Sequence, residues 1–177
     1  MVIQLKGEIM NKRLLTIIIA LMFLVIVATP VTAAQSGYIQ IAGITNSCNG
    51  GSGLAGYCEI NGFQQEVNAM DCPKGGGASS CHANFTLIIG KQLDTSSPKF
   101  LEATASQKLL RTVTIQYLQP NSSNSFYIIN LTNARVTDDI SSFENEQISF
   151  NFEKITWKWE PKPLICWDIS QNRICTS

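Results

Sequence analysis

Six cysteines are the residues of this sequence with the most definite chemistry. They fall into three close couples, and in an exported chain an even number of cysteines is typical of disulfides. A bond within each couple would close a loop of about ten residues and stabilise the fold by about 2.5–3 kcal/mol in the chain-entropy description, although six cysteines allow other pairings. The couples are Cys48 with Cys58, Cys72 with Cys81, and Cys166 with Cys175.

Catalytic and metal-binding chemistry finds little support elsewhere. His82 is the only histidine, so a Ser-His-Asp arrangement or a zinc site with C-x-x-C spacing is disfavoured. Asp138, Asp139, Glu144 and Glu146 could in principle act as general acids or bind Ca²⁺. Adjacent carboxylates on a strand point to opposite faces, however, and a solvated polar connection is the preferred interpretation. The sequence therefore predicts a protein that is not an enzyme and holds no cofactor or metal.

Two further sets of residues suggest recognition or modification. Trp157 and Trp159 would share one face of a strand, which suits either core or interface packing or a platform for carbohydrate, and packing is preferred. Asn84, Asn121 and Asn130 lie in N-x-S/T sequons and are candidate glycan acceptors in an exported chain.

The N-terminal segment has the features of a signal peptide. Lys12-Arg13 precede the apolar run from Leu14 to Ala28, and small residues follow as far as Ala33. The run is shorter than the roughly 20 residues that a membrane span needs, so cleavage after Ala33 or Ala34 is preferred over a retained anchor. Translation from Met10 would give a more compact signal. We expect a signal peptide over 1–33, a folded domain over 34–162 and a cysteine-closed tail over 163–177.

Charge is balanced, since 13 basic residues face 13 acidic ones. This balance gives no electrostatic reason to expect a nucleic acid or an anionic membrane as a partner. We expect no membrane association once the signal peptide has been removed.

The stretch 85–118 is the most informative part of the sequence for the fold. It predicts a strand over Phe85–Ile89, a single helix over residues 97–109 and a further strand over Leu110–Leu118. Ser97 and Pro98 suit a helix start, as a capping residue followed by a proline in the first turn.

The predicted helix carries a narrow apolar stripe. Phe100, Leu101 and Ala105 recur at helical spacing, so we expect them to pack across the rest of the domain. On this expectation, Leu101→Asp would unfold the protein.

The remaining mature sequence alternates as strands do. Strands are predicted over Gly37–Ile44 and Tyr57–Val67, with Asn61-Gly62 as either a hairpin turn or a bulge, and one strand or a pair of strands is predicted over Phe126–Val136. Gln147–Trp159 alternates with a slip of one residue near Glu153-Lys154, which predicts one long strand with a bulge. The expected fold is mainly β, a barrel or two-sheet sandwich with one flanking helix.

The order of these motifs resembles the haemolysin-coregulated protein (Hcp) family, the tube proteins of type VI secretion. Lys91 and Leu93–Pro98 are similar to the family's K-x-x-D-x-x-S-P, Phe126–Ala134 to a family strand, and Ile148–Trp157 to the family's closing strand. The similarity extends from about Gly37 to Pro161.

The resemblance implies an Hcp-like β-barrel with one helix, ring-shaped hexamers that stack into a hollow tube, and no catalytic site. Tube proteins of this family normally lack a signal peptide, whereas this chain has one together with its predicted disulfides. We therefore expect an exported subunit that self-associates into an extracellular filament. The alternatives are a secreted monomeric module that binds carbohydrate or a surface ligand, and a type VI tube or effector component.

Overall fold

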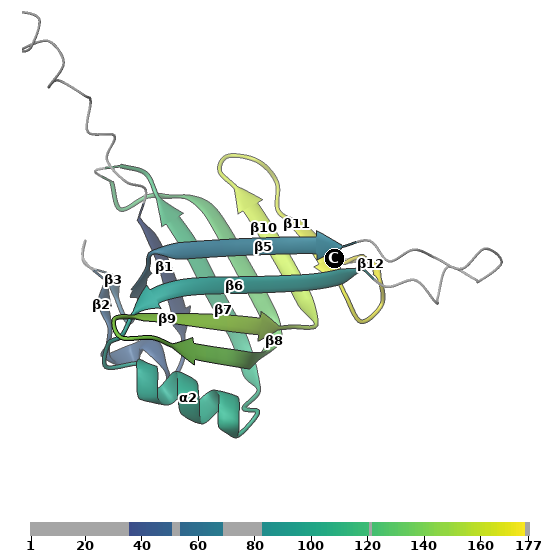
Figure 1. Cartoon of the computed structure of the whole chain (residues 1–177). Coiled ribbons are helices and arrows are strands. Elements are labelled where there is room, and N and C mark those ends of the chain that lie inside the picture. Colours follow the sequence, from purple (N-terminus) through teal and green to yellow (C-terminus); the bar gives the residue numbers. More distant parts are fainter. Residues whose placement is uncertain (1–35, 51–53, 69–82, 121, 176–177) are drawn as a thin grey trace, which may run out of the picture. The chain divides into compact units, whose positions relative to one another are not determined.

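The computed structural model describes residues 36–50, 54–68, 83–120 and 122–175, which form antiparallel strands and one α-helix (Figure 1). The expectation of a mainly β fold with one flanking helix is confirmed. No helix among these residues is long and apolar enough to cross a membrane. The elements are β1 (Gly37–Ile41), the 3₁₀ helix η1 (Thr45–Ser47), β2 (Asn49–Gly50), β3 (Leu54–Ala55), β4 (Cys58–Ile60), β5 (Gly62–Asn68), β6 (Asn84–Gln92), α2 (Ser97–Ala105), β7 (Leu110–Leu118), β8 (Ser125–Ser141), β9 (Asn145–Asn151), β10 (Lys154–Trp159), β11 (Ile165–Asp168) and β12 (Arg173–Ile174).

Strand β8 is long enough to belong to two layers. Its first half pairs with β7 and β10, and its second half, from Arg135, pairs with β9 with a shift of register between Val136 and Asp138. One layer has the order β12-β11-β10-β8-β7-β1-β4, and the other runs β8-β9-β6-β5. The predicted pair of sheets is therefore one sheet that folds back on itself through β8.

Strands β4 and β5 connect the two layers at the other side. They are separated only by Asn61, and β4 pairs with β1 while β5 pairs with β6. Asn61-Gly62 thus forms a bend that carries one strand from the first layer into the second, and not a hairpin turn. The strands pair in the order β1, β7, β8, β9, β6 and β5, and the bend joins β5 to β4, which pairs with β1. This circuit makes a barrel.

The core fills the space between the two layers. Leu87, Ile89 and Ile148 from one layer and Ile115 and Ile129 from the other are fully buried in a single cluster. They alternate with polar or exposed residues along their strands, as a half-buried strand requires. Burial of each such side chain contributes about 1.5–3 kcal/mol.

Helix α2 lies along one side of the barrel but is shorter than expected and packs through other residues. It ends at Ala105, and the positive φ of Gln107 turns the chain towards β7. Phe100 and Ala103 are buried, whereas Leu101 is 49% exposed and Ala105 is exposed. The expectation that Leu101 and Ala105 pack across the barrel was wrong, because Phe100 and Ala103 define a buried stripe rotated away from them.

The slip near Glu153-Lys154 also has a different origin from the one expected. It separates β9, which pairs with β6 and the second half of β8, from β10, which pairs with the first half of β8. Glu153 donates its backbone N–H to Thr132 O at the crossing. The slip marks the passage from one layer to the other, and the prediction of a single bulged strand was wrong.

The acidic stretch after residue 137 is a hairpin and not a loose polar connection. Asp138 and Asp139 lie in β8, Glu146 lies in β9, and only residues 142–144 form the turn. Glu146 is 1% exposed. The sequence offered no signal for this burial, because a glutamate beside two other carboxylates is typical of a solvated turn.

The C-terminal tail adds two strands to the first layer. β11 pairs with β10, and β12 pairs with β11, so Ile165–Ile174 extend the sheet beyond the barrel. A positive φ at Asn172 makes the tight turn between them.

Candidate functional site

Two of the expected disulfides lie in the described residues. Cys48 is bonded to Cys58 at the η1–β4 loop, and Cys166 is bonded to Cys175 across β11 and the end of β12. Cys72 and Cys81 lie outside the described residues. Neither bond is near a group that could use it catalytically, so both act here as covalent closures of loops.

A buried lysine is the most unusual polar group of the barrel. The Lys91 side chain is fully buried, and its Nζ lies 2.9 Å from Glu146 Oε2 and 3.1 Å from Asp94 Oδ1. Nζ also donates to Gln92 O at 2.8 Å and to Ser97 Oγ at 3.2 Å. A buried charge is tolerated when it is paired and fully hydrogen-bonded, and this one is.

This Lys91 cluster fixes the start of helix α2. Ser97 accepts a hydrogen bond from Asp94 N and donates one to Glu146 Oε2 at 2.7 Å. The role expected for Ser97 as the helix cap was wrong: Ser96 is the cap residue, without a capping bond from its side chain, and Asp94 Oδ1 accepts the backbone N–H of Ser96. The K-x-x-D-x-x-S-P motif therefore ties β6, α2 and β9 together.

Two carboxyl groups meet behind this cluster. Asp139 lies next to Glu146, and Asp139 Oδ2 and Glu146 Oε1 are both buried without a hydrogen-bond partner among the described residues. Burial, together with the charge of Glu146, raises the pKa of Asp139 to about 6. Below that pH Asp139 is protonated, and its O–H can then donate to the adjacent Glu146.

Asp94 behaves in the opposite way. Burial alone would raise the pKa of its carboxyl group, but hydrogen bonds from Ser96 and the neighbouring Lys91 outweigh burial and lower it. Asp94 therefore stays charged and available to Lys91 over the pH range in which Asp139 titrates.

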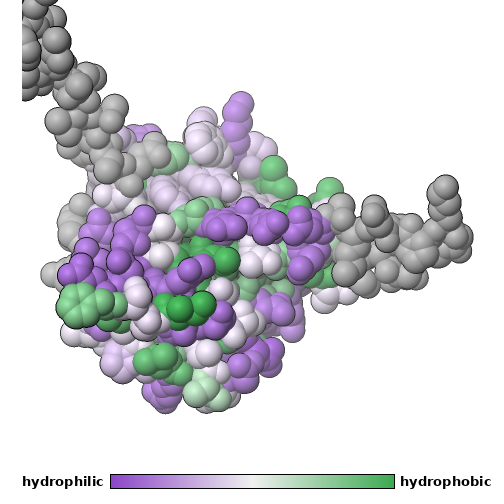
Figure 2. All heavy atoms as spheres, in the orientation of Figure 1, coloured by the Kyte–Doolittle hydropathy of each residue, from purple (hydrophilic) through white to green (hydrophobic). Residues whose placement is uncertain are grey.

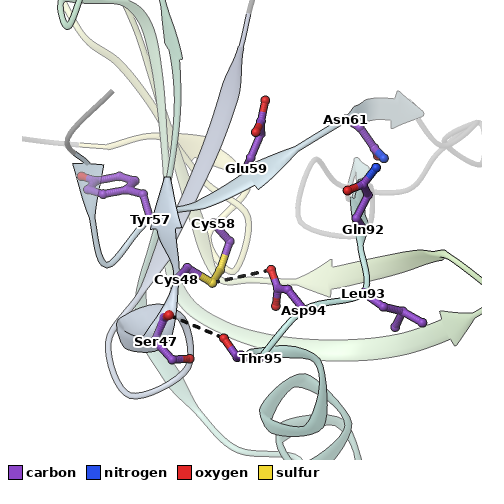
Figure 3. Close-up of a pocket in the computed structure, with 10 residues that line it drawn as sticks. All are labelled: Ser47, Cys48, Tyr57, Cys58, Glu59, Asn61, Gln92, Leu93, Asp94 and Thr95. Carbon is purple, nitrogen blue, oxygen red and sulfur yellow. Dashed lines mark hydrogen bonds between the residues drawn. A yellow bond between two sulfur atoms is a disulfide. The ribbon is translucent and has the colours of Figure 1, made fainter. Parts of the chain in front are cut away.

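A pocket of about 460 Å³ opens beside the Cys48–Cys58 bond (Figure 3). Asp94 Oδ2 lies 3.7 Å from Cys48 Sγ, and Ser96 Oγ lies 3.4 Å from Cys58 Sγ. Cys48, Cys58 and Asp94 are close enough to hold a metal, but a disulfide has no thiolate to offer. The pocket lies where the η1–β4 loop contacts the segment that leads into α2.

The two tryptophans proposed for recognition differ in exposure. Trp157 is half-buried: its Nε1–H donates to Gln65 Oε1 at 3.0 Å, and its ring packs against Phe85. Trp159 is 54% exposed and contacts Phe126 and Tyr127. Trp157 thus bridges β10 to β5 and is committed to the fold, which leaves only Trp159 with a broad exposed ring.

The candidate glycan acceptors lie in different surroundings. Asn84 is exposed at the start of β6, and Asn121 lies outside the described residues. Asn130 is half-buried: it accepts from Thr114 Oγ1 at 2.9 Å and donates to Thr156 Oγ1 at 3.4 Å. A glycan on Asn130 would have to break this bridge between three strands, so Asn84 is the better placed of the two.

Sequence comparison identifies a family. The chain matches the family described as "Type VI secretion system effector, Hcp" over residues 38–159. A search among curated proteins found no match.

Several solved structures share the fold. Hcp1 from Salmonella typhimurium superposes with a TM-score of 0.67 at 14% identity, with 80% of this chain and 99% of that one covered. A structure described as a type six secretion system protein gives 0.67 at 18% identity, with 80% and 100% covered. The secreted protein Hcp3 from Pseudomonas aeruginosa gives 0.60 at 22% identity, with 76% and 99% covered. The family match over residues 38–159 contains the barrel and α2 and ends before β11 and β12.

Proposed function

The chain belongs to the Hcp family of type VI secretion system proteins, and on this basis we propose that it is an exported structural subunit that assembles into stacked rings and forms a hollow extracellular tube. The observation that carries the proposal is the family match over residues 38–159, because these residues include every strand of the closed barrel. The segment that lies outside the match at the N-terminus supplies the predicted signal peptide.

The ionisable residues of the barrel support a structural role. Lys91 is paired with both Asp94 and Glu146 inside the fold, and Asp139 lies next to Glu146. Groups held in this way stabilise packing and are poorly placed to bind a substrate. The disulfides fit a protein that works outside the cytoplasm, where such bonds persist.

In a ring, one surface of each subunit contacts a different surface of its neighbour, and the repeated contact returns to the first subunit. Stacking of rings needs a further contact, which repeats along the tube without returning to its start. The closed barrel suits this task. Its strands pair in the order β4, β1, β7, β8, β9, β6 and β5, which leaves its faces and hairpins and the outer edges of β5 and β12 available for assembly.

Electron microscopy of the exported, non-reduced protein and of the surface of the cells that make it tests this proposal. We expect rings and stacked tubes in both samples. Protein that stays monomeric at all concentrations, together with cells that carry no tubes, would instead favour a monomeric binding module. A glycan array with a Trp159→Ala control would then show whether the ligand is a carbohydrate.

The mass of the exported protein tests the signal peptide separately. We expect the N-terminal residue to be Ala34 or Gln35. An N-terminus before Leu14 would remove the argument for export and would favour a tube or effector component of a type VI system that assembles in the cytoplasm.

A further inference from the structure

The inner face of the first layer is wider than the layer that covers it. Two rows of side chains cross this face from β8 outwards, and strand pairing fixes which residues lie side by side. In one row Ile129 is fully buried, Trp157 is half-buried and Ile165 is 61% exposed. The same apolar face therefore continues past the point where β5, the last strand of the covering layer, ends.

The second row shows the same gradient. Ile155 is fully buried, Trp167 is half-buried and Ile174 is 67% exposed. Trp159 and Leu164, at the β10–β11 turn, are 54% and 52% exposed. We call the four exposed residues, Trp159, Leu164, Ile165 and Ile174, the tail patch. Large apolar side chains grouped in this way on a surface mark a site of interaction.

A second surface on another side of the barrel is suited to receive them. The outer face of β5, β6 and β9 carries a groove of about 400 Å³, and the paired Gly62 and Gly90 on adjacent strands contribute no side chain to it. Ile88 and the 57% exposed Ile140 also line the groove. Figure 2 shows this face, with hydrophobic side chains grouped at its centre among polar ones. We call it the groove face.

The charges around the two surfaces are complementary. Glu66 and Asp138 are exposed on the groove face. Lys91 is buried, and it is the only basic residue of β5, β6, β9 and the last five residues of β8. Lys162 and Arg173, which flank the tail patch, are both exposed basic residues. An apolar patch with a basic rim therefore matches a groove of mixed apolar and polar lining with an acidic rim.

The two surfaces belong to opposite sides of their layers. The tail patch continues the inner face of the first layer, whereas the groove is on the outer face of the second. Because one copy cannot bring them together without unfolding, a contact between them must join two copies. A contact between two different patches is heterologous and can close into a ring.

We propose that the tail patch of one subunit docks on the groove face of a second copy of this chain, so that β11 and β12 form the contact between neighbours in a ring. This inference rests on the proposed assembly. It assigns a role to the disulfide-closed tail, which follows the residues matched by the family model.

Two variants and their mixture test the proposal by native mass spectrometry of the exported, non-reduced proteins. The tail variant is Ile165→Glu with Ile174→Glu, and the groove variant is Asp138→Lys with Ile140→Lys. All four positions are exposed, so each variant should keep the circular dichroism spectrum of the wild type. Leu101→Asp, an equally exposed apolar position on α2, is the matched control.

We expect the wild type and the control to form the same oligomer and each variant alone to stay monomeric. An equimolar mixture of the two variants should form dimers and nothing larger, because only one intact contact remains between them. Folded variants that assemble like the wild type, or a mixture that gives no dimer, would overturn this inference and leave the proposed ring intact. A wild type that is itself monomeric would overturn the proposed function as well.

Discussion

At the scale of single residues, the fold depends on one buried lysine. Lys91 is held by two carboxylates, a hydroxyl and a carbonyl, and it joins β6, α2 and β9. Removal of one member of a buried ion pair leaves its partner charged in an apolar surrounding, which costs more than the pair itself contributes.

Lys91→Met should therefore lower the free energy of unfolding by about 3–5 kcal/mol. Lys108→Met, at an exposed position, should change it by no more than about 0.5 kcal/mol. Denaturant titration of the two variants measures both values. Equal stabilities would mean that Lys91 contributes nothing beyond an exposed lysine.

The raised pKa of Asp139, next to Glu146, predicts that the free energy of unfolding depends on pH. The pKa of Asp139 is about 6 in the folded state, above its value of 3.8 in the absence of the fold, so the folded state binds the proton more tightly. The free energy of unfolding should therefore fall as pH rises from about 4 to about 7, because the unfolded state loses this proton first. The lowered pKa values of Asp94 and Asp168 act below this range.

Asp139→Asn should abolish that part of the pH dependence, since an amide can donate to Glu146 at every pH. Urea denaturation midpoints at pH 5 and pH 7.5 measure the effect. The difference in stability between the wild type and the variant should favour the wild type more at pH 5 than at pH 7.5. A parallel pH profile for both proteins would show that Asp139 titrates normally.

At the scale of elements, helix α2 is fastened to the barrel by a narrow stripe. Phe100→Ala removes a fully buried ring and should destabilise the protein by about 3–5 kcal/mol. Leu101→Asp, one position away but 49% exposed, should change stability by about 0.5 kcal/mol or less. Thermal unfolding of the two variants separates these expectations. A Leu101→Asp protein as unstable as Phe100→Ala would show that the helix packs through the other side.

The two described disulfides should differ in their contributions although they close loops of similar length. The chain-entropy term is about 2.5–3 kcal/mol for each. Cys58 is buried beside Ser96 and the core, however, while Cys166–Cys175 closes a tail at the edge of the sheet.

Cys48→Ser with Cys58→Ser should therefore lower the melting temperature of the barrel more than Cys166→Ser with Cys175→Ser. The second pair should instead speed amide hydrogen exchange in β11 with little change in the rest of the barrel. Exchange followed by mass spectrometry gives both results in one experiment. Uniform loss of protection in both proteins would mean that the tail folds cooperatively with the barrel.

The elements that were predicted correctly have strong local signals. The stretch 110–118 alternates through Val113 and Ile115, and its bounds as β7 match the prediction. The failures come from contacts that are distant in sequence. Whether Leu101 or Ala103 faces the core depends on where β8 lies, and the change of layer after Asn151 depends on which strand pairs with β6.

The Lys91 cluster was visible in the sequence only as a motif. The spacing of Lys91, Asp94 and Ser97 indicated a relation to the family, but nothing local pointed to Glu146, which is 55 residues from Lys91 and completes the ion pair. Exposure of the tail patch was equally hidden, because it follows from the width of one layer relative to the other.

At the scale of the whole molecule, the family match covers the barrel and α2, and the disulfide-closed strands β11 and β12 follow the matched residues. These two strands cover the edge of β10 with a hairpin and carry the exposed Ile165 and Ile174, beside Trp159 and Leu164 at the β10–β11 turn. On our account, this hairpin is how an exported relative makes a stable contact between subunits.

Cryo-electron microscopy of the exported, non-reduced protein tests the central claim most directly. The account predicts closed rings that stack into hollow tubes, in which the β11–β12 hairpin of each subunit lies on the β5–β6–β9 face of its neighbour. A sample that contains only separate monomers at every protein concentration would contradict it.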